Sequence, residues 1–398
     1  MATNLAARAS RVLMNTYGPR SLSFVRGRGV WVWDAAGKKY LDLLGGVAVN
    51  ALGHCHPAVV RAICAQARKI LHVSNLYLIE PQIRLAEELV ESTFADRAFF
   101  CNSGTEANEA ALKLARKFFF LKKESRDHLV AFQNSFHGRT TGSLALTAQE
   151  KYQKAFRPLL PVNVARFNDL GDADRMITPG TAAVFVELVQ GEGGMETATA
   201  TFLAGLRRIC SRRGALLVYD EVQTGNGRTG DLFAYQHFGE RLAPDLLTTA
   251  KGLAGGVPIG ALLARRPYAD AFEAGDHAAT FGGNFLACAS ALAAFRVLSS
   301  ASFLKSVRDR SAVLWARLRA VKERFPDKIE TLRGLGMMAG LKLRLPFSSK
   351  TLRERLQARR VLTGISGESV LRLTPPLVIS RMEILLGVRA IEEEVAAL

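Results

Sequence analysis

Three ionisable residues stand where runs of apolar sequence stop. Ala215 to Tyr219 is short, apolar and partly β-branched, which is typical of a strand buried on both faces of a parallel sheet. Asp220 and Glu221 follow directly, at the carboxyl end of that strand, where open α/β sheets place their ligand crevices. Lys251 lies in TTAKGLAGG, whose small residues leave room for a bulky planar group. A buried carboxylate together with a desolvated lysine indicates pyridoxal phosphate, which needs a lysine amine and an anion beside its ring nitrogen.

A second chemical feature is the tripeptide from Ser103 to Thr105, which follows the strand-like run AFFCN and opens a helix. Gly104 permits close backbone approach, and free amides at a helix N-terminus favour an anion. The segment is therefore a candidate phosphate site. Ser103 and Glu106 also form a capping-box pattern by themselves. Both interpretations can hold, because capping and phosphate binding use different amides.

Five longer segments stand in order along the chain: NSGTEANEAALKLARK, FHGRT, DEVQTGNGRTG, TTAKGLAGGVPIGA and TFGGN. Together they resemble the class III, pyridoxal-phosphate-dependent aminotransferases. Within that group LGHCHP, SNLYLIEPQ, GDHAATFGGN and VLRLTPPL are most similar to the acetylornithine aminotransferases. The resemblance extends over nearly the whole chain from about Tyr17 onward, so it is far more specific than any single glycine motif.

Strands and helices alternate from Arg97 onward, with AFFCN, a helix to about Lys122, and then LVAFQN, AAVFVELV and LLVYDE as strands. This alternation predicts an α/β fold with a mostly parallel central sheet and helices on both faces. The resemblance implies fold type I, the aspartate aminotransferase-like arrangement. We expect residues 58–298 to form the large cofactor-binding domain. Residues 1–57, an N-terminal arm and hairpin, and residues 299–398 are expected to form a smaller α+β domain from both chain ends.

The resemblance assigns cofactor roles to particular residues. Lys251 and Asp220 are the predicted catalytic residues, because Lys251 would attach to the cofactor and move a proton while Asp220 pairs with the ring nitrogen. Phe136 would stack on the ring, Val222 would pack against its face, and Gln223 would hydrogen-bond its hydroxyl group. The phosphate would be held by Ser103, Gly104 and Thr105, and by Thr280 of the second subunit in a homodimer with shared active sites. Without the resemblance, Phe136 would be interpreted as a core residue and Thr280 as a turn residue.

Three further residues match the family's substrate contacts. Arg139 would grip a substrate carboxylate with its planar fork, although alone it would be interpreted as a surface charge. Arg372 would bind a carboxylate next to the reacting carbon. Glu192 would cover Arg372 when no such carboxylate is present, since an unpaired, partly buried guanidinium is costly. A static salt bridge is the alternative for this pair.

Neighbouring positions complete the predicted site. Glu187, at the end of AAVFVELV, is expected to order the polar layer around the acids. His137 is expected to pack or hydrogen-bond nearby. Leu188 and Phe285 stand where the resembling enzymes usually carry proline. We expect the turn after Leu188 to be less rigid while the chemistry is retained, and we expect Phe285 to add bulk near the dimer seam and to change the shape of the local loop.

The composition bounds the class of protein. The chain has 398 residues, 48% of them apolar and 22% charged, which is typical of a soluble globular protein with two domains. No apolar run reaches the ~18 residues of a membrane-spanning helix. Five cysteines are scattered without CxxC or Cys/His spacing, which argues for a reducing compartment and against a metal site. The first 33 residues hold five arginines and no acid, as transit peptides do, but the resemblance begins at Tyr17 and favours a cytoplasmic location.

The net charge of +17 is a feature that nucleic-acid and membrane-surface proteins share. Here the basic residues are spread over helical segments such as LARKFFFLKKESR and LQARR, without a long basic block. A solvated surface is therefore the favoured interpretation, and no nucleic acid or membrane partner is expected. A positive field would also favour an anionic cofactor and dicarboxylate substrates.

These features predict transfer of the terminal amino group of N2-acetylornithine to 2-oxoglutarate, giving N-acetylglutamate 5-semialdehyde and glutamate, as in arginine biosynthesis. The alternative within the class is another ω-aminotransferase, acting on succinylornithine, succinyldiaminopimelate, ornithine or 4-aminobutyrate. From a different class, the chain would be a cofactor-binding regulator or a nucleic-acid partner. The joint presence of Lys251, Asp220, Arg139 and Arg372 argues against that alternative.

Overall fold

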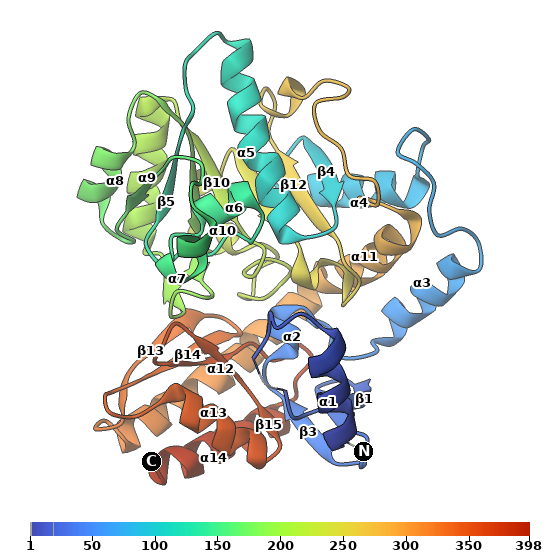
Figure 1. Ribbon diagram of the computed structural model, residues 1–398, viewed down its shortest axis with the longest axis vertical. Helices are drawn as coiled ribbons and strands as arrows, with labels where there is room; N and C mark the ends of the chain where they lie inside the picture. The colour runs from blue at the N-terminus through green and yellow to red at the C-terminus, as the bar shows by residue number, and fades with distance from the viewer. Residues whose placement is uncertain (1, 19) are drawn as a thin grey trace.

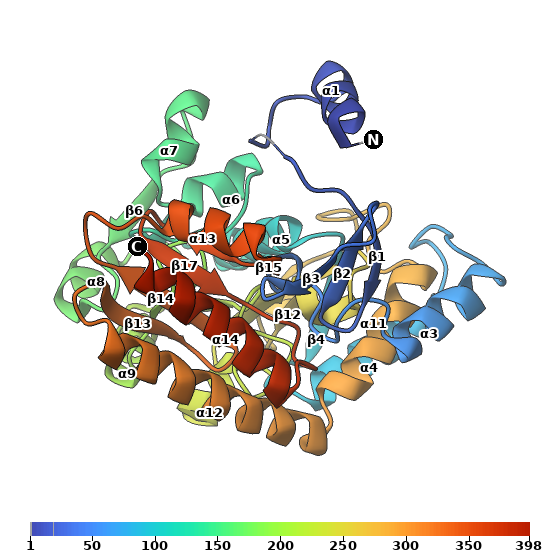
Figure 2. The same ribbon diagram turned by 90° about the horizontal axis from the view of Figure 1, so that it is seen from below.

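The computed structural model describes residues 2–18 and 20–398 (Figure 1). Met1 and Pro19, which the predicted N-terminal segment includes, lie outside the described residues. In Figure 1 the middle of the chain forms the upper part of the molecule, and the two ends of the chain lie together below it. Seen from below, helix α1 (Ala2–Val12) stands apart from the rest (Figure 2).

The upper part is built on a seven-stranded sheet with the order β4-β12-β11-β10-β7-β5-β6. Neighbouring strands from β11 to β6 are parallel. Strand β12 is antiparallel to both β11 and β4. The mostly parallel sheet predicted from the sequence is thus confirmed, with one reversed strand. The strands are β4 (Arg97–Cys101), β5 (His128–Phe132), β6 (Val162–Ala165), β7 (Thr181–Glu187), β10 (Leu216–Asp220), β11 (Leu246–Thr249) and β12 (Gly260–Ala264).

Helices cover both faces of this sheet, which explains why its central strands β7, β10 and β11 are buried at every position. In β10, Leu217 and Tyr219 belong to one hydrophobic cluster, while Leu216 and Val218 belong to another on the opposite face. Successive side chains of a strand point to opposite faces, so such a strand must be buried twice. Helix α5 (Gly104–Leu121) packs on one face, and α4 (Glu80–Glu91), α9 (Ala200–Arg213) and α11 (Phe285–Leu298) contribute to the cluster on the other.

The lower part joins both ends of the chain. The predicted hairpin forms between β2 (Trp31–Asp34) and β3 (Lys39–Asp42), and a third strand, β1 (Phe24–Arg28), pairs with β2. The edge of β3 is paired in parallel with β15 (Val361–Leu362) from the other end of the chain. A second sheet has the order β13-β14-β17-β16, with β13 (Ile329–Leu335), β14 (Met338–Leu343), β16 (Gly364–Ser366) and β17 (Val370–Leu373).

A separate hydrophobic core supports this lower part. It contains Val30, Leu41 and Leu52 from the beginning of the chain and residues from Val307 to Val395 from its end. This shared core supports the proposed smaller domain, whose bounds at 57 and 299 stay a prediction. The helices around it are α12 (Ala301–Arg324), α13 (Ser349–Ala358) and α14 (Arg381–Ala396).

Helix α5, predicted to end at about Lys122, ends at Leu121, and helix α3 spans Pro57–Ala67. Helix α2 (Gly45–Ala48) is a turn in which all four residues have positive φ, so it is not right-handed. The remaining short elements are α6 (Thr141–Leu146), α7 (Glu150–Gln153), α8 (Leu170–Met176), α10 (Ala234–Phe238), β8 (Val189–Gln190) and β9 (Glu196–Thr197).

Within residues 2–18 and 20–398, no single helix combines the length and apolarity needed to cross a membrane. Helices α11 and α12 reach that composition only as a pair, and they meet at a bend of 67°.

Candidate active site

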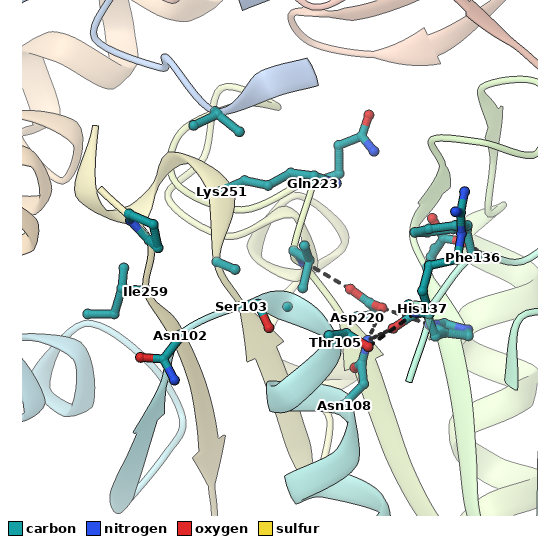
Figure 3. A pocket seen from close by; sticks show the side chains of 18 of the residues that line it. Asn102, Ser103, Thr105, Asn108, Phe136, His137, Asp220, Gln223, Lys251 and Ile259 are labelled. Atoms are coloured by element: carbon teal, nitrogen blue, oxygen red, sulfur yellow. Dashed lines mark hydrogen bonds and ion pairs between the residues drawn. The ribbon is translucent and has the colours of Figure 1, made fainter. Parts of the chain in front are cut away.

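A cavity of about 430 Å³ opens beside the carboxyl ends of the central strands (Figure 3). It collects residues from β10, from the loop after β11, from the start of α5 and from the segment after β5. This is the place at which open α/β sheets bind ligands. Nine of the predicted site residues line it: Ser103, Gly104, Thr105, Phe136, Arg139, Asp220, Val222, Gln223 and Lys251.

Asp220 is the last residue of β10 and is only 4% exposed. Its Oδ2 accepts hydrogen bonds from Nδ1 of His137 at 2.7 Å and from Nδ2 of Asn108 at 2.8 Å, and its Oδ1 accepts one from the backbone N–H of Val222 at 3.0 Å. Figure 3 shows the three side chains meeting at the floor of the cavity. The carboxylate is therefore fixed in one orientation by donors on both of its oxygens.

His137 is buried, with Nδ1 toward Asp220, and its Nε2 has no hydrogen-bond partner among residues 2–18 and 20–398. Burial alone would lower its pKa, but the hydrogen bond to Asp220 and the charges of Asp220 and Glu187 raise the pKa above the ordinary value. An imidazole that keeps its Nδ1 proton is a permanent donor to Asp220. The expectation of a hydrogen-bonding neighbour at this position is met by that contact.

Glu187 ends β7 directly beside Asp220, its register partner on β10. Its carboxyl group accepts hydrogen bonds from the backbone N–H groups of Phe136 at 2.8 Å and Gly191 at 3.2 Å. Burial raises its pKa to about 7, and the nearby negative charge of Asp220 acts in the same direction. Glu187 thereby ties the segment that carries Phe136 to the central sheet.

Lys251 follows β11 and has a left-handed backbone, with φ of 42°. Burial lowers the pKa of its amine, although the charges of Asp220 and Glu192 oppose that shift. A lysine with a lowered pKa is more often neutral and is then a nucleophile. The chain beside it is tightly packed, since a Cβ on Gly252 would lie 3.2 Å from that of Asn226 and 3.3 Å from that of Ala51.

The start of α5 faces the same cavity. Ser103 caps the helix by accepting from the backbone N–H of Glu106 at 3.3 Å, and Glu106 in turn accepts from the N–H of Asn102 at 2.7 Å. Of the predicted capping box, the Ser103 half is thus present, whereas Glu106 bonds the N–H of Asn102 and not that of Ser103, and the first-turn amides remain available to an anion. Gly104 is required here, because a Cβ at this position would lie 2.7 Å from Cγ1 of Val222.

Arg139 lies at the rim of the cavity and is exposed. Its guanidinium carbon lies 4.4 Å from the ring centre of Tyr152 and 5.4 Å from that of Phe136. The two rings meet edge to face at 5.9 Å. Stacking on both rings limits the directions in which the guanidinium can point, so it is presented toward the entrance of the cavity.

Glu192 and Arg372 form an ion pair beside the cavity. Nη1 of Arg372, on β17, donates to the Glu192 carboxylate and, at 3.0 Å, to the carbonyl of Gly191. The Arg372 side chain is 7% exposed and that of Glu192 24% exposed. Charges on both residues act on the pKa of Lys251. The pairing expected from the sequence is therefore present, while its role as a switch stays a prediction.

Thr280 does not reach the cavity within one chain. It lines a separate hollow of about 650 Å³ together with His72 and Asn75. Large apolar side chains are exposed around that hollow, including Leu76 at 86% and Leu78 at 88%. This position is compatible with the predicted contribution of Thr280 to a second subunit's site, which stays a prediction.

The two proline departures are accommodated. Phe285 is the first residue of α11, a position at which proline is tolerated but not required, and Asn284 caps the helix by accepting from the N–H of Ala287 at 2.9 Å. Leu188 is fully buried, and its carbonyl accepts a hydrogen bond from the N–H of Ala198 at 2.9 Å.

Asn108 belongs to the site although no sequence motif pointed to it. It bonds Asp220, the carbonyl of His137 at 2.7 Å and the hydroxyl of Thr248 at 2.8 Å. The available signal was an amide on a helical face that is otherwise alanine and leucine. Within the described part of the chain, no group of three His, Cys, Asp or Glu side chains is arranged to hold a metal ion.

This fold and site define the class of the protein: the chain belongs to the class-III aminotransferases, whose sequence pattern matches residues 14–395. Pyridoxal phosphate is the cofactor of this class, on a fold of type I. The cavity fits it, because it offers a buried amine at Lys251, a fixed carboxylate at Asp220 and, at Gln223, a buried Oε1 that accepts no hydrogen bond from the part of the chain that the structure describes.

Individual relatives lie closer within the class. The chain is 46% identical over 379 residues to the succinylornithine transaminase of Citrobacter koseri, covering 94% of this chain and 93% of the relative. It is 45% identical to that of Yersinia pseudotuberculosis, with 94% and 92% covered. Among solved structures, the N-acetylornithine aminotransferase of Stenotrophomonas maltophilia is 36% identical, with 96% and 97% covered and a TM-score of 0.83. The ornithine aminotransferase of Toxoplasma gondii is 30% identical, with 100% and 95% covered and a TM-score of 0.95.

Proposed function

We propose that this aminotransferase moves the terminal amino group of an N2-acylated ornithine to 2-oxoglutarate, in two half-reactions that share one cavity. The observation that carries the proposal is the Glu192–Arg372 ion pair beside Lys251. An acylornithine presents only an amine at its reacting carbon. 2-Oxoglutarate also presents a carboxylate next to that carbon, so the site needs a cation that binds this carboxylate. When the acylornithine is bound, the site must neutralise the same cation.

Arg372 provides that cation. With acylornithine bound, Glu192 stays on Arg372, and the nearly buried guanidinium keeps a partner. With 2-oxoglutarate bound, the substrate carboxylate takes the place of Glu192, whose side chain is the more exposed of the two and can turn toward solvent. Leaving the guanidinium unpaired would cost about 3 kcal/mol. This cost is the physical reason why one carboxylate replaces the other on Arg372.

The remaining residues bind and orient the reacting groups. The bound cofactor supplies a ring that withdraws electrons from the reacting carbon. Asp220, held by His137 and Asn108, would keep the ring nitrogen protonated. Lys251, with its lowered pKa, would transfer the proton at the reacting carbon, and Arg139 would hold the carboxylate at the far end of either substrate. Phe136 and Val222, which line the cavity, would exclude water from the ring.

The acyl group is the finer question. N2-acetylornithine is the substrate that the sequence motifs predict, and the sequence identity to the N-acetylornithine aminotransferase of S. maltophilia is 36%. Identity to succinylornithine transaminases is higher, at 45 to 46%. We therefore take N2-succinylornithine as the first substrate to test and N2-acetylornithine as the second.

The experiment is a direct comparison of amino donors. The purified enzyme is supplied with 2-oxoglutarate and with N2-succinylornithine, N2-acetylornithine, ornithine, succinyldiaminopimelate or 4-aminobutyrate, and glutamate formation is measured as kcat/KM for each. We expect both acylornithines to exceed the free amines. A higher kcat/KM with ornithine or 4-aminobutyrate would reject an acylornithine as the substrate.

A homodimer is part of the proposal. The hollow lined by Thr280 and the exposed apolar residues near it, Leu76, Leu78 and Phe281, support a contact with a second copy of the chain. Thr280 would then complete the neighbour's phosphate site. The cytoplasmic location, which was predicted from the sequence, is likewise a proposal.

A further inference from the structure

Arg228 is a buried cation that the reaction described above does not use. It lies in the loop between β10 and α10 and is 1% exposed. In the part of the chain that the structure describes, no carboxylate pairs with it, and burial alone lowers its pKa to about 9. Placing a guanidinium in such a position costs free energy that an apolar side chain of similar size would not.

The hydrogen bonds of Arg228 connect the two parts of the molecule. Its Nη1 donates to the carbonyl of Pro375 at 2.5 Å and, at 3.4 Å, to that of Met337. Its own backbone carbonyl accepts from the N–H of Met337 at 2.9 Å. The loop and the lower part also touch through their backbones, since a Cβ on Gly336 would lie 2.4 Å from Cα of Thr229.

Both partners of Arg228 lie just outside the ends of two paired strands, β14 and β17, of which β17 carries Arg372. Met337 directly precedes β14, and Pro375 lies two residues after the end of β17. The two strands are antiparallel neighbours, and in their register Gly340 of β14 faces Arg372 of β17. The guanidinium of Arg228 therefore holds the adjoining ends of the two strands that set the position of Arg372.

The other side of the same loop is attached to the cofactor cavity. Val222 and Gln223 line the cavity itself. Asn226 donates from Nδ2 to the hydroxyl of Thr249 at 3.0 Å and to the carbonyl of Ala250 at 3.2 Å, directly before Lys251. The loop thus has one set of bonds to the wall that carries Lys251 and another, through Arg228, to the strand that carries Arg372.

We propose that Arg228 is a positioning residue that sets the place of Arg372 relative to Lys251, and that it thereby determines how well the site binds a carboxylate next to the reacting carbon. The proposal rests on the proposed function, because it requires Arg372 to bind that carboxylate. Carbonyl acceptors suit this task, because they fix the backbone of the two strands without neutralising the positive charge of Arg228, which acts on Arg372.

The test separates the two half-reactions of the holoenzyme. In Arg228→Met we expect KM for 2-oxoglutarate and glutamate to rise by about 10-fold to 100-fold, the range for a displacement of about 1 Å, while KM for the acylornithine changes less than about 3-fold. Arg228→Lys keeps a donor but not the planar fork, and we expect a smaller rise in the same direction. The absorbance of the lysine-bound cofactor should be that of the parent in both variants.

Arg308→Met is the matched control. Arg308, on α12, also links the lower part to this loop, because its Nη1 donates to the carbonyl of Gly230 at 2.6 Å and lies 3.6 Å from the carboxylate of Asp231, so its polar partners are in the loop and not at the ends of β14 and β17. We expect it to change KM for both substrates equally. Equal changes in Arg228→Met, or in Arg228→Lys if the methionine variant does not fold, would overturn the positioning role and leave only a structural one.

A further variant distinguishes failure of this inference from failure of the proposed function. Arg372→Ala should weaken 2-oxoglutarate and glutamate selectively. If it does so and neither Arg228 variant does, the inference about Arg228 is wrong. If Arg372→Ala itself has no selective effect, the assignment of Arg372 is wrong and the inference falls with it.

Discussion

Nδ1 of His137 lies 2.7 Å from Oδ2 of Asp220, and both side chains are buried. His137 comes from the segment after β5 and Asp220 from the end of β10, with β7 between the two strands. The hydrogen bond therefore crosses a neighbouring strand and fixes the carboxylate from the side. Together with Asn108, it leaves the negative charge of Asp220 in a defined place and direction.

Replacement of Asp220 by Asn should retain the cofactor but reduce kcat by at least about 100-fold, because a neutral amide cannot hold the ring nitrogen in its protonated form. Cofactor content of the purified variant and its single-turnover rates provide the measurement. A rate within a few-fold of the parent would mean that the ring nitrogen does not face Asp220.

Lys251→Ala should abolish the absorbance of the lysine-bound cofactor and lower turnover by more than about 10⁴-fold, because it removes both the attachment point and the proton-transfer group. The circular dichroism spectrum should stay that of the parent, since Lys251 has a chemical role. Parent-like turnover in this variant would exclude Lys251 from the reaction.

The variants Glu192→Ala and Arg372→Ala should impair opposite half-reactions. Without Glu192, the guanidinium of Arg372 remains available to carboxylates, so the acylornithine half-reaction should slow more than the glutamate half-reaction, and α-amino acids should become better donors. Without Arg372, binding of 2-oxoglutarate and glutamate should weaken by about 2 kcal/mol or more, roughly 30-fold.

Single-turnover rates for each half-reaction measure this difference directly. A static salt bridge predicts equal losses in both half-reactions for both variants. That result would remove the exchange of partners on Arg372 from the mechanism.

The buried carboxyl group of Glu187 gives a pH dependence of stability with a defined sign. Burial raises its pKa from 4.5 to about 7 in the folded protein. The folded state therefore binds this proton more tightly than the unfolded chain, and the free energy of unfolding should fall by up to about 3 kcal/mol as pH rises from about 4.5 to 7. Urea unfolding of the parent and of Glu187→Gln at several pH values should show a flatter dependence in the variant. Identical slopes would show that Glu187 titrates normally.

If Thr280 completes a neighbour's phosphate site, dilution to monomers should release cofactor, and Thr280→Ala should weaken cofactor binding by about 1 kcal/mol or more, roughly 5-fold. Sedimentation combined with cofactor absorbance across a dilution series measures both quantities. Thr178→Ala removes a hydroxyl whose partner, the hydroxyl of Thr181 at 3.5 Å, lies in the same chain, and it serves as the control. A fully active monomer with its cofactor retained would contradict the shared site.

The central sheet was predictable because burial on both faces leaves a clear pattern. Val184, Phe185 and Val186 form a continuous apolar run that only a doubly covered strand requires. Strand β12 gave no comparable signal of its direction, because GALLA from Gly260 to Ala264 reads the same in a parallel or an antiparallel strand. Its reversal is set by the connection after Lys251 and by pairing with β4 on the far side.

The residues of the site were likewise predictable only in part. Lys251, Asp220 and the start of α5 were predictable because motif chemistry and strand ends coincide there. Asn108 and Arg228 were not, because their partners are a buried acid and backbone carbonyls that come close only in three dimensions. Within GNGRTG, Arg228 had the local surroundings of a turn residue, and nothing in the neighbouring sequence indicated that Pro375 would be its acceptor.

The parallel pairing of β3 with β15, Leu41 opposite Val361, has a consequence for the synthesis of the protein. The N-terminal hairpin leaves the ribosome first, yet one edge of its sheet and much of its core are completed by residues at the other end of the chain. Closing such a long loop is entropically costly and slow. The central sheet can assemble during translation. The hairpin, in contrast, keeps its apolar face uncovered until the last helices have left the ribosome. During that interval the nascent chain most needs a chaperone.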